Sequence, residues 1–236
     1  MDVDFTSVAK LLGNPARSAM VAAMLDGRAI TAGELARVAR VEPSTASEHL
    51  GDLVRGGLVS VTAHGRHRYF QLTGAEVAEA LEALAQICPR TPVSSLRASA
   101  EASAIGFART CYDHIAGVLG VAILDGLLAQ KWLVVSDDNF EAGPAGYEGF
   151  AAFDIDVDAL QRQRRRFARP CLDWTVRRPH LAGSLGAAFC TALLQERWVE
   201  RKQRHRGLLL TPVGDSQLRA VLDIAIDPHT SPTRGR

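Results

Sequence analysis

The sequence predicts a mostly helical protein with small β-hairpins, in which an N-terminal winged helix precedes a C-terminal half of two repeated helix-hairpin units. Three observations lead to this fold class. Residues 31–50 have the pattern of two short helices around a tight turn, residues 58–73 have that of a β-hairpin, and residues 114–132 recur at 180–198. A helix-turn-helix followed by a hairpin wing is a winged helix, a fold that mostly binds duplex DNA.

Local signals place the N-terminal elements one after another. Asn14 is expected to cap a helix with Pro15 at its first position, Pro43 favours another helix start, and Gly56 and Gly57 are expected to end that helix and turn the chain. The predicted elements are helices over 5–12, 15–25, 34–39 and 44–55, a wing over 58–73 with a polar tip at 64–67, and a helix over 75–88.

The C-terminal half contains an internal repeat. Residues 114–132 align with 180–198 at an offset of 66 with nine of 19 positions identical, and residues 107–113 align with 167–173 at an offset of 60. Each copy is expected to hold a helix, a strand led by Trp132 or Trp198, a polar turn and a return strand. The predicted domains are 1–88 for DNA binding and 93–226 for sensing and dimerisation, with repeats at about 105–158 and 165–226, followed by a flexible tail at 227–236.

Composition indicates a globular protein without a membrane segment. The longest apolar stretch, 115–129, has 15 residues and contains Asp125, whereas a helix needs roughly 20 to cross a bilayer. Asp2 and Asp4 stand where a secretory signal carries basic residues, so we expect a cytoplasmic protein, and the four cysteines fit reduced thiols there. The net charge is +1, and the acidic run 137–158 and the Arg-rich run 161–178 are interpreted as solvated faces.

The winged helix supplies the candidate DNA contacts. The first turns of a recognition helix enter the major groove, and a wing tip can reach phosphates or the minor groove. For Ser44, the alternative role is an N-cap. The candidates are Ser44, Thr45, Ser47, His49, Arg66 and Arg68.

The same segment resembles the ArsR/SmtB family of winged-helix regulators. The resemblance covers about the first third of the chain and is carried by 34–36, 44–50, 56–59, Gly65 with Arg66, and Tyr69. It implies a homodimeric bacterial transcriptional regulator, usually a repressor that an inducer releases from its operator, with the helices that flank the winged helix forming the dimer interface.

The metal ligands best known in this family are not carried over. Such ligands are a cysteine pair in the helix that corresponds to 34–39, or histidines and acids on the last helix of the domain; here 34–39 has no thiol and 75–88 has no histidine. If the protein senses a ligand, we therefore expect the duplicated half to bind it.

A repeated Arg-x-Cys-x-Asp motif marks the candidate ligand site. Cys111 and His114 are three residues apart and are predicted to share a helical face, and the Arg and Asp of each motif, four apart, are predicted to pair on that helix. Three interpretations stay open: core packing, an apolar or thiol-reactive pocket, and a metal such as zinc bound by two copies across a pseudo-twofold axis. The candidate residues are Cys111, Asp113, His114, Cys171, Asp173, His180, Trp132, Trp174 and Trp198.

These patterns predict a dimeric repressor that binds double-stranded DNA and is released by a metal ion or small-molecule inducer bound in the C-terminal half, with no cofactor required for folding. The alternative is an architectural or partner-regulated DNA-binding protein with no inducer, which the absence of an apolar cavity in the repeated half would favour. An enzyme with Cys111 or Cys171 as nucleophile is disfavoured, because the sequence has no nucleophile elbow and no phosphate-binding glycine loop.

Overall fold

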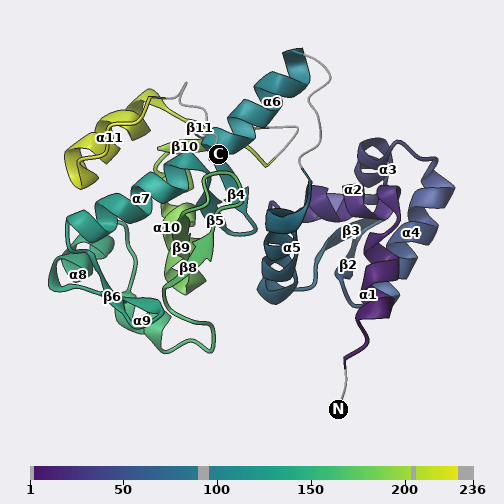
Figure 1. Ribbon diagram of the computed structural model, residues 1–236, viewed down its shortest axis with the longest axis horizontal. Coiled ribbons are helices and arrows are strands. Elements are labelled where there is room, and N and C mark those ends of the chain that lie inside the picture. The colour runs from purple at the N-terminus through teal and green to yellow at the C-terminus, as the bar shows by residue number, and fades with distance from the viewer. Residues whose placement is uncertain (1–2, 90–95, 203–205, 228–236) are drawn as a thin grey trace. The chain divides into compact units, whose positions relative to one another are not determined.

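The computed structural model describes residues 3–89, 96–202 and 206–227. The chain forms two compact units, Met1–Glu82 and Ala83–Arg236, and the division falls within helix α5 (Ala75–Ile87) (Figure 1). The predicted domain limits stay predictions, and most of the predicted tail, 228–236, lies outside the described residues. In the described part of the chain, no helix is long and apolar enough to cross a membrane.

The first unit is a winged helix. Its elements are α1 (Phe5–Leu12), α2 (Pro15–Met24), β1 (Ile30–Thr31), α3 (Ala32–Ala39), α4 (Pro43–Arg55), β2 (Val59–His64), β3 (His67–Leu72) and the first part of α5. Helices α2 and α3 begin after residues that cap them. Asn14 accepts hydrogen bonds from the backbone N–H groups of Ala16 and Arg17, and Thr31 and Glu34 form a reciprocal capping box.

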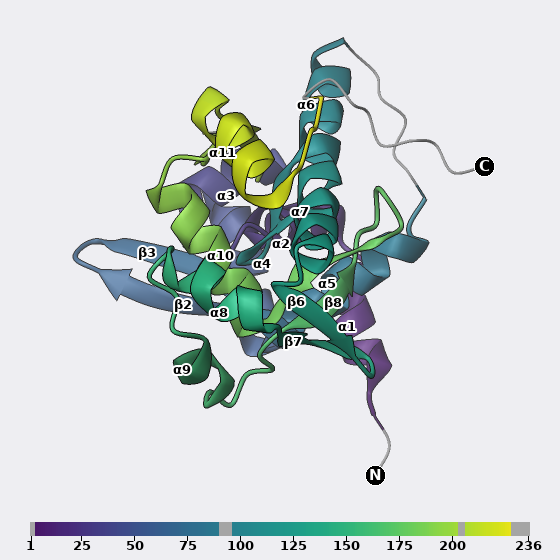
Figure 2. The same cartoon turned by 90° about the vertical axis from the view of Figure 1, so that its left-hand side faces the viewer.

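The core of this unit lies between its helices and a small sheet. Leu35, Leu50 and Leu53 are fully buried. The sheet has the antiparallel order β1-β3-β2, and β1, which the sequence analysis missed, pairs Ile30 with Phe70. Figure 2 shows β2 and β3 projecting as a long hairpin, the wing, and Gly65 at its tip has a φ of 58° that suits glycine.

The second unit repeats one order of elements. Helix α6 (Leu96–Phe107) comes first, and then a hairpin, a helix, a hairpin and a helix follow twice. The first series is β4 (Arg109–Cys111), β5 (His114–Ala116), α7 (Val118–Ala129), β6 (Leu133–Ser136), β7 (Asn139–Ala142) and α8 (Pro144–Ala151); after α9 (Val157–Gln161), the second is β8 (Arg169–Leu172), β9 (Pro179–Ala182), α10 (Gly183–Gln195), β10 (Val199–Arg201), β11 (Leu208–Leu210) and α11 (Pro212–Leu222). Descent of the two series from a duplication stays an interpretation of the sequence.

The two motif segments are β-hairpins, so the prediction of a shared helical face for Cys111 and His114 is wrong. The physical reason lies in the glycines that follow the hairpins. Gly117 and Gly183 have φ values of 85° and 94°, outside the right-handed helical region, so α7 and α10 do not continue back past these glycines to the histidines.

The two series interlock. Helix α7 packs against β9, and α10 packs against β5, so each helix lies on a hairpin of the other series. Gly120 and Gly186 lie at these contacts. A Cβ on Gly120 would lie 2.4 Å from the carbonyl oxygen of Ile115 and 3.5 Å from Cβ of His180, and one on Gly186 would lie 2.7 Å from the carbonyl oxygen of Leu181 and 3.3 Å from Cβ of His114. Side chains of both series share one hydrophobic core.

Candidate nucleic-acid interface and candidate metal centre

Helix α4 carries four of the candidate DNA contacts in its first two turns. Ser44 and Ser47 are exposed, whereas Thr45 and His49 are half-buried. The N-cap of α4 is Glu42 and makes no side-chain capping hydrogen bond, so the alternative that Ser44 caps this helix is wrong. The hydroxyl of Ser47 donates to the carbonyl oxygen of Pro43 at 2.9 Å, and its lone pairs stay available to an incoming donor.

The wing carries the other two. Arg66 and Arg68 are exposed, and the guanidinium carbon of Arg68 lies 5.8 Å from the centre of the Phe70 ring. His64 and His67 face each other where the strands meet the turn. A hairpin tip with two exposed guanidinium groups suits contact with phosphates.

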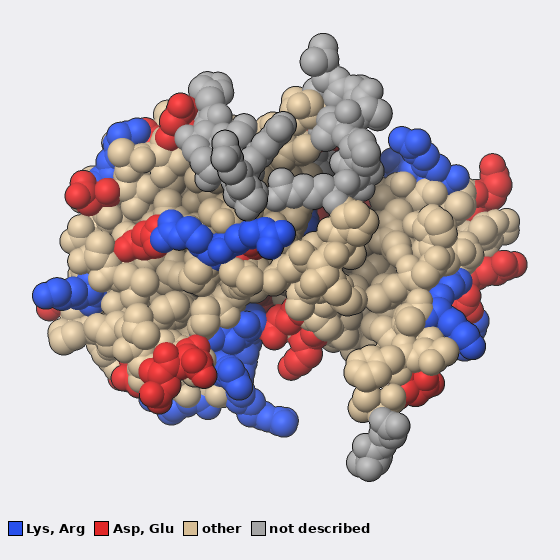
Figure 3. Space-filling view, viewed as in Figure 1, with Lys and Arg blue, Asp and Glu red and all other residues tan. Residues whose placement is uncertain are grey.

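Acidic and basic side chains lie next to each other on parts of the surface of the second unit. Figure 3 shows acidic side chains gathered over α9 with basic side chains beside them. Two arginines of the Arg-rich run are paired within this unit: Arg165 with Asp113, and Arg178 with Asp125 at 2.8 Å. Part of the Arg-rich run therefore offsets acidic charges of the same unit that lie outside the acidic run 137–158.

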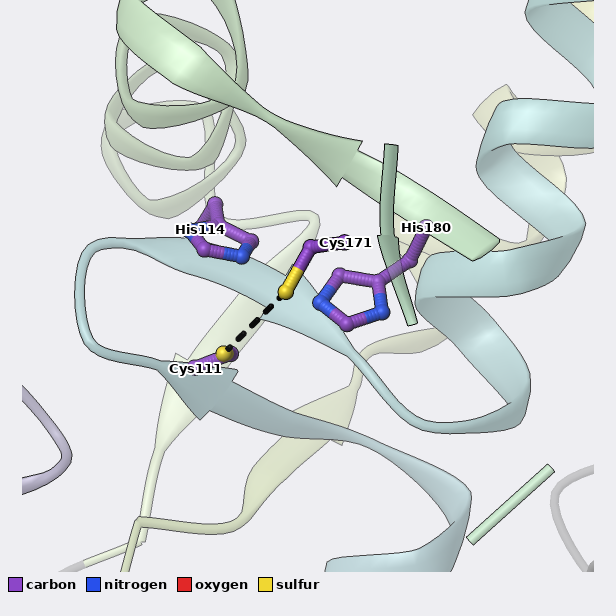
Figure 4. Close-up of side chains that lie close together, drawn as sticks. All are labelled: Cys111, His114, Cys171 and His180. Atoms are coloured by element: carbon purple, nitrogen blue, oxygen red, sulfur yellow. Dashed lines mark hydrogen bonds between the residues drawn. The ribbon is translucent and has the colours of Figure 1, made fainter. Parts of the chain in front are cut away.

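The second unit brings four candidate ligand residues together, and we call Cys111, His114, Cys171 and His180 the thiol-imidazole cluster. Each hairpin supplies one pair, since Cys111 faces His114 across β4 and β5, and Cys171 faces His180 across β8 and β9. The potential ligand atoms all lie within 4.8 Å of one another, and the two Sγ atoms are 4.0 Å apart. Figure 4 shows the side chains converging from the two hairpins.

The cluster is buried, and three of its four ring nitrogens have no hydrogen-bond partner. Cys111 and His114 are 2% exposed, His180 is 1% exposed and Cys171 is 9% exposed. Nε2 of His114 and both ring nitrogens of His180 have no hydrogen-bond partner. The two rings stack with their centres 5.1 Å apart. Buried polar atoms are nearly always hydrogen-bonded, so three unpaired nitrogens in one place call for a physical explanation.

Asp113 and Asp173, the aspartates of the two motifs, each lie next to Nδ1 of a cluster histidine. Oδ1 of Asp113 lies 3.2 Å from Nδ1 of His114, and Oδ2 of Asp173 lies 3.7 Å from Nδ1 of His180. Asp113 is held by the guanidinium of Arg165, and Asp173 by that of Arg109 at 2.8 Å. The predicted pairing of each motif's Arg and Asp along one helix is therefore wrong, because Arg109 bonds the aspartate of the other hairpin.

These surroundings shift several pKa values. Burial would raise the pKa of both aspartates, but His114 and Arg165 beside Asp113, and Arg109 and Thr175 beside Asp173, hold each pKa at about 2. The neighbouring Cys111 thiol lowers the pKa of Cys171 to about 2, against burial and together with the two histidines.

The two imidazoles are affected in opposite directions. Burial lowers the pKa of His180, which favours its neutral, metal-binding form. Burial acts the same way on His114, but Asp113 and Cys171 outweigh it and raise the pKa of His114. The cluster therefore favours a thiolate at Cys171 beside the imidazole of His114, whose raised pKa favours the protonated form.

The candidate tryptophans lie outside the cluster. Trp132 packs edge-on against Phe150, with ring centres 5.2 Å apart, and Trp198 packs likewise on Phe153 at 5.1 Å. Trp174 stacks under the guanidinium of Arg109, whose central carbon is 4.8 Å from the ring centre. Trp132 and Trp198 thus belong to the core, and Trp174 supports the buried arginine.

A small cavity lies beside the cluster, between α7 and α10. It is lined by Ile115, Leu181 and Phe189 among others, and its volume is about 10 Å³. A single water needs about 10 to 15 Å³ by this kind of measure, so an organic inducer does not fit there. This argues against the interpretation of an apolar ligand pocket at this place.

The arrangement can do two things chemically. Two thiols and two imidazoles are a donor set for a tetrahedral metal ion, and two thiols can also be oxidised to a disulfide. All four residues stand out in the sequence, but their juxtaposition does not, because cross-strand pairing and the contact between hairpins are not visible in local spacing. The signal that could have indicated a hairpin is the glycine that follows each histidine three residues later, Gly117 and Gly183, which interrupts the helical pattern.

Comparisons with known proteins match the chain over its first third and, in one relative, over nearly its full length. A family model described as a helix-turn-helix domain matches residues 12–62. Over 226 residues the chain is 39% identical to the HTH-type transcriptional regulator YdfF of Bacillus subtilis (strain 168), and the alignment covers 96% of this chain and 100% of that protein.

Solved structures match over a smaller part. The homodimeric winged helix-turn-helix DNA-binding domain of Mb0332 from Mycobacterium bovis, described as a possible ArsR-family regulator, is 30% identical over 35% of this chain and 74% of its own, with a TM-score of 0.31. The cadmium metal sensor CMTR from Mycobacterium tuberculosis is 30% identical over 39% of this chain and 100% of its own, also with a TM-score of 0.31.

Proposed function

Because the chain belongs to the family of helix-turn-helix transcriptional regulators, we propose that it is a dimeric repressor that a ligand bound in its second unit releases from DNA. The observation that carries this proposal is the thiol-imidazole cluster. It places four potential ligands, all nine-tenths or more buried, in the unit that lacks the DNA-reading helix. The family membership confirms the expectation of a winged helix-turn-helix regulator of transcription, and the dimer, the sense of regulation and the ligand are our proposals.

The geometry of α4 and the wing supports groove binding. The exposed side chains of Ser44 and Ser47 lie near the positive end of the helix dipole, which favours phosphates and base acceptors nearby. Arg66 and Arg68 on the wing add positive charge for the backbone of the DNA. We therefore assign base contacts to α4 and phosphate contacts to the wing.

Exposed apolar side chains support dimerisation. Helix α1 has no buried residue, and its apolar side chains are exposed: Phe5 is 78% exposed and Val8 is 38% exposed. On α5, Leu84 is 43% exposed and Ile87 is 81% exposed. Apolar faces of this kind are often interaction sites, and the resemblance to ArsR/SmtB proteins implies an interface formed by the flanking helices. A second copy also supplies the second recognition helix that specific DNA binding needs.

Regulation requires a ligand that distinguishes two states. A ligand changes DNA affinity only if it binds the DNA-competent and the DNA-incompetent dimer unequally. A coupling free energy of roughly 1 to 3 kcal/mol is typical and corresponds to about 5- to 150-fold in affinity. The ligand site that we propose lies in the second unit, so the coupling has to pass between the units.

The proposal is tested with DNA selected from a random pool by the full-length protein. Its affinity for the selected site is measured by fluorescence anisotropy for protein treated with a chelator, with Zn²⁺ and with a thiol-alkylating reagent. We expect at least one treatment to change the affinity by about 5-fold or more. Equal affinity under all treatments would support the architectural alternative, and sedimentation of a monomer both free and on DNA would exclude the dimer.

A further inference from the structure

We propose that the thiol-imidazole cluster binds one divalent ion of the zinc class with two sulfur and two nitrogen ligands, and that this ion is the regulatory ligand. The geometry of the cluster alone supports the binding site. The regulatory role rests on the proposed function, and the experiment below separates the two.

The spacing of the donors fits a tetrahedral ion. Zinc-sulfur bonds of about 2.3 Å at the tetrahedral angle place two sulfur atoms about 3.8 Å apart. The Sγ atoms of Cys111 and Cys171 are 4.0 Å apart, and all four donors lie within 4.8 Å of one another. A disulfide would require about 2.05 Å between the sulfur atoms, so the two thiols are unlinked and close to the separation that an ion would impose.

The chemistry of the donors selects the class of ion. Thiolates prefer zinc and similar thiophilic ions, and a tetrahedral set of two sulfur and two nitrogen atoms is diagnostic of zinc among the common divalent metals. Two thiolates also neutralise a divalent charge, which lets the ion occupy a site where three of the four side chains are no more than 2% exposed. Because the protein fills all four positions, the ion has no open position for catalysis.

The second layer around the site has the arrangement that metal-bound histidines show. Such histidines usually donate the other ring N–H to a carboxylate, which fixes the ring and its tautomer. Asp113 is hydrogen-bonded to Nδ1 of His114 at 3.2 Å, and Asp173 lies 3.7 Å from Nδ1 of His180, beyond hydrogen-bond distance. These positions leave Nε2 of each ring for the ion. This accounts for the unpaired Nε2 atoms and for a motif that places an aspartate two residues after each cysteine.

An ion at this site would affect the arrangement of hairpins and helices in the second unit. Each hairpin supplies one sulfur and one nitrogen, so the ion would tie β4–β5 to β8–β9. Helices α7 and α10 pack on the hairpin of the other series, with Gly120 facing His180 and Gly186 facing His114. A change in the separation of the hairpins therefore displaces both central helices.

The test uses the full-length protein freed of metal by a chelator under reducing conditions. Co²⁺ is titrated as the spectroscopic probe, followed by Zn²⁺ as competitor. We expect one Co²⁺ per chain, with the visible bands of a tetrahedral ion and a thiolate-to-cobalt charge-transfer band that Zn²⁺ abolishes. X-ray absorption of the zinc form should show two sulfur atoms at about 2.3 Å and two nitrogen atoms at about 2.0 to 2.1 Å.

Variants assign the ligands. Cys171→Ser should weaken Zn²⁺ binding by more than about 100-fold, and Asp113→Asn, which alters only the second layer, by about 10- to 100-fold. Cys190→Ser is the matched control, because Cys190 is a buried thiol of the same unit that lies outside the cluster, and it should bind Zn²⁺ as the natural protein does. If Cys171→Ser does not fold, the X-ray absorption of the unaltered protein shows whether two sulfur atoms bind the zinc ion.

The outcomes are distinct. Zinc with no sulfur neighbours, no specific binding of Zn²⁺, or formation of a disulfide between Cys111 and Cys171 in place of metal binding would overturn the site. Zinc bound at the cluster without any change in affinity for the selected DNA would leave the site intact and overturn its regulatory role. A change in DNA affinity caused by another ligand, with no metal at the cluster, would overturn this inference and leave the proposed function standing.

Discussion

Arg109 and Asp173 form a fully buried ion pair between the two hairpins of the second unit, with Nη2 of the guanidinium 2.8 Å from Oδ2 of the carboxylate. The carboxylate also accepts hydrogen bonds from the backbone N–H groups of Gly117 at 2.7 Å and Thr175 at 2.8 Å. Trp174 covers the guanidinium. Burying two charges is costly, and this many partners is the condition under which a buried pair is tolerated.

Removing the carboxylate charge should therefore destabilise the second unit. Asp173→Asn leaves Arg109 buried without a counter-ion, and we expect the free energy of unfolding to fall by about 3 to 5 kcal/mol. The three tryptophans all lie in this unit, so their fluorescence during urea denaturation reports its unfolding. Asp215→Asn, which breaks an exposed pair with Arg219, is the control and should cost less than about 0.5 kcal/mol. A decrease below about 1 kcal/mol for Asp173→Asn would contradict the structural role of the pair.

Acid should destabilise the second unit by protonating the carboxylates of Asp113 and Asp173. Asp113 and Asp173 have pKa values of about 2 in the folded protein against 3.8 ordinarily, so folding favours their charged forms. A lowered folded-state pKa contributes stability above about pH 4 that disappears as the pH falls toward 2, by about 2 kcal/mol for each group. Urea denaturation followed by tryptophan fluorescence from about pH 5 to pH 2 measures this decrease. In Asp113→Asn the fall should be shallower, and an unchanged profile would remove Asp113 from the explanation.

The wing should contribute affinity without sequence preference. The Arg66→Ala, Arg68→Ala double variant should bind all DNA sequences more weakly, and its log-log salt slope should flatten by about 1 for each phosphate that the wing no longer neutralises. Ser47→Ala or His49→Ala should instead change the ratio of affinities for the selected site and a single-base variant of that site. Anisotropy titrations at several salt concentrations distinguish these effects. An unchanged slope in the double variant would mean that the wing does not touch the DNA.

Dimerisation through the exposed apolar side chains of α1 and α5 should be weakened by polar or charged substitutions. Ile87→Asp on α5, combined with Phe5→Ser on α1, should shift the protein to monomers in sedimentation velocity, because both side chains are exposed in a single chain and would be buried between two. Val213→Ser in α11 is the control, since Val213 is 56% exposed but lies on neither of these helices. A dimer that persists in the double variant would place the interface elsewhere.

The first unit could be predicted almost element by element because its signals are local. Asn14 and Pro15 mark the start of α2 by their own chemistry, and Gly65 marks the turn of the wing. Strand β1 was missed because it has only two residues and exists through its pairing with β3, which no local pattern records.

The second unit illustrates the opposite case. Alignment of its two series predicted which residues recur, but the three-residue spacing of Cys111 and His114 was equally compatible with a helix. Their actual relation depends on Tyr112, whose φ of 60° turns the chain into a hairpin, and on proximity to a segment 60 residues away. Long-range contacts of this kind decide the site, and the sequence records them only as the repetition of the motif.

The close approach of helices and hairpins around the cluster should make one glycine position unusually sensitive. In Gly120→Ala, the added Cβ would lie 2.4 Å from the carbonyl oxygen of Ile115, so backbone must move, and overpacking of this kind costs about 1 to 3 kcal/mol. Gly126→Ala in the same helix is the control. There the added Cβ meets the Ile224 side chain at 2.9 Å and Cβ of Leu222 at 3.1 Å, which belong to the C-terminal segment and not to a hairpin of the cluster, and the better helix propensity of alanine offsets part of the cost.

Urea denaturation followed by tryptophan fluorescence gives the change in stability of both variants, and the Co²⁺ titration on the same samples gives the consequence for the site. Because the shifted helix α7 presses on β9, which carries His180, Gly120→Ala should weaken Co²⁺ binding while Gly126→Ala leaves it near that of the natural protein. Equal metal affinity in both variants, with Gly120→Ala clearly destabilised, would show that the position of α7 is not coupled to the cluster.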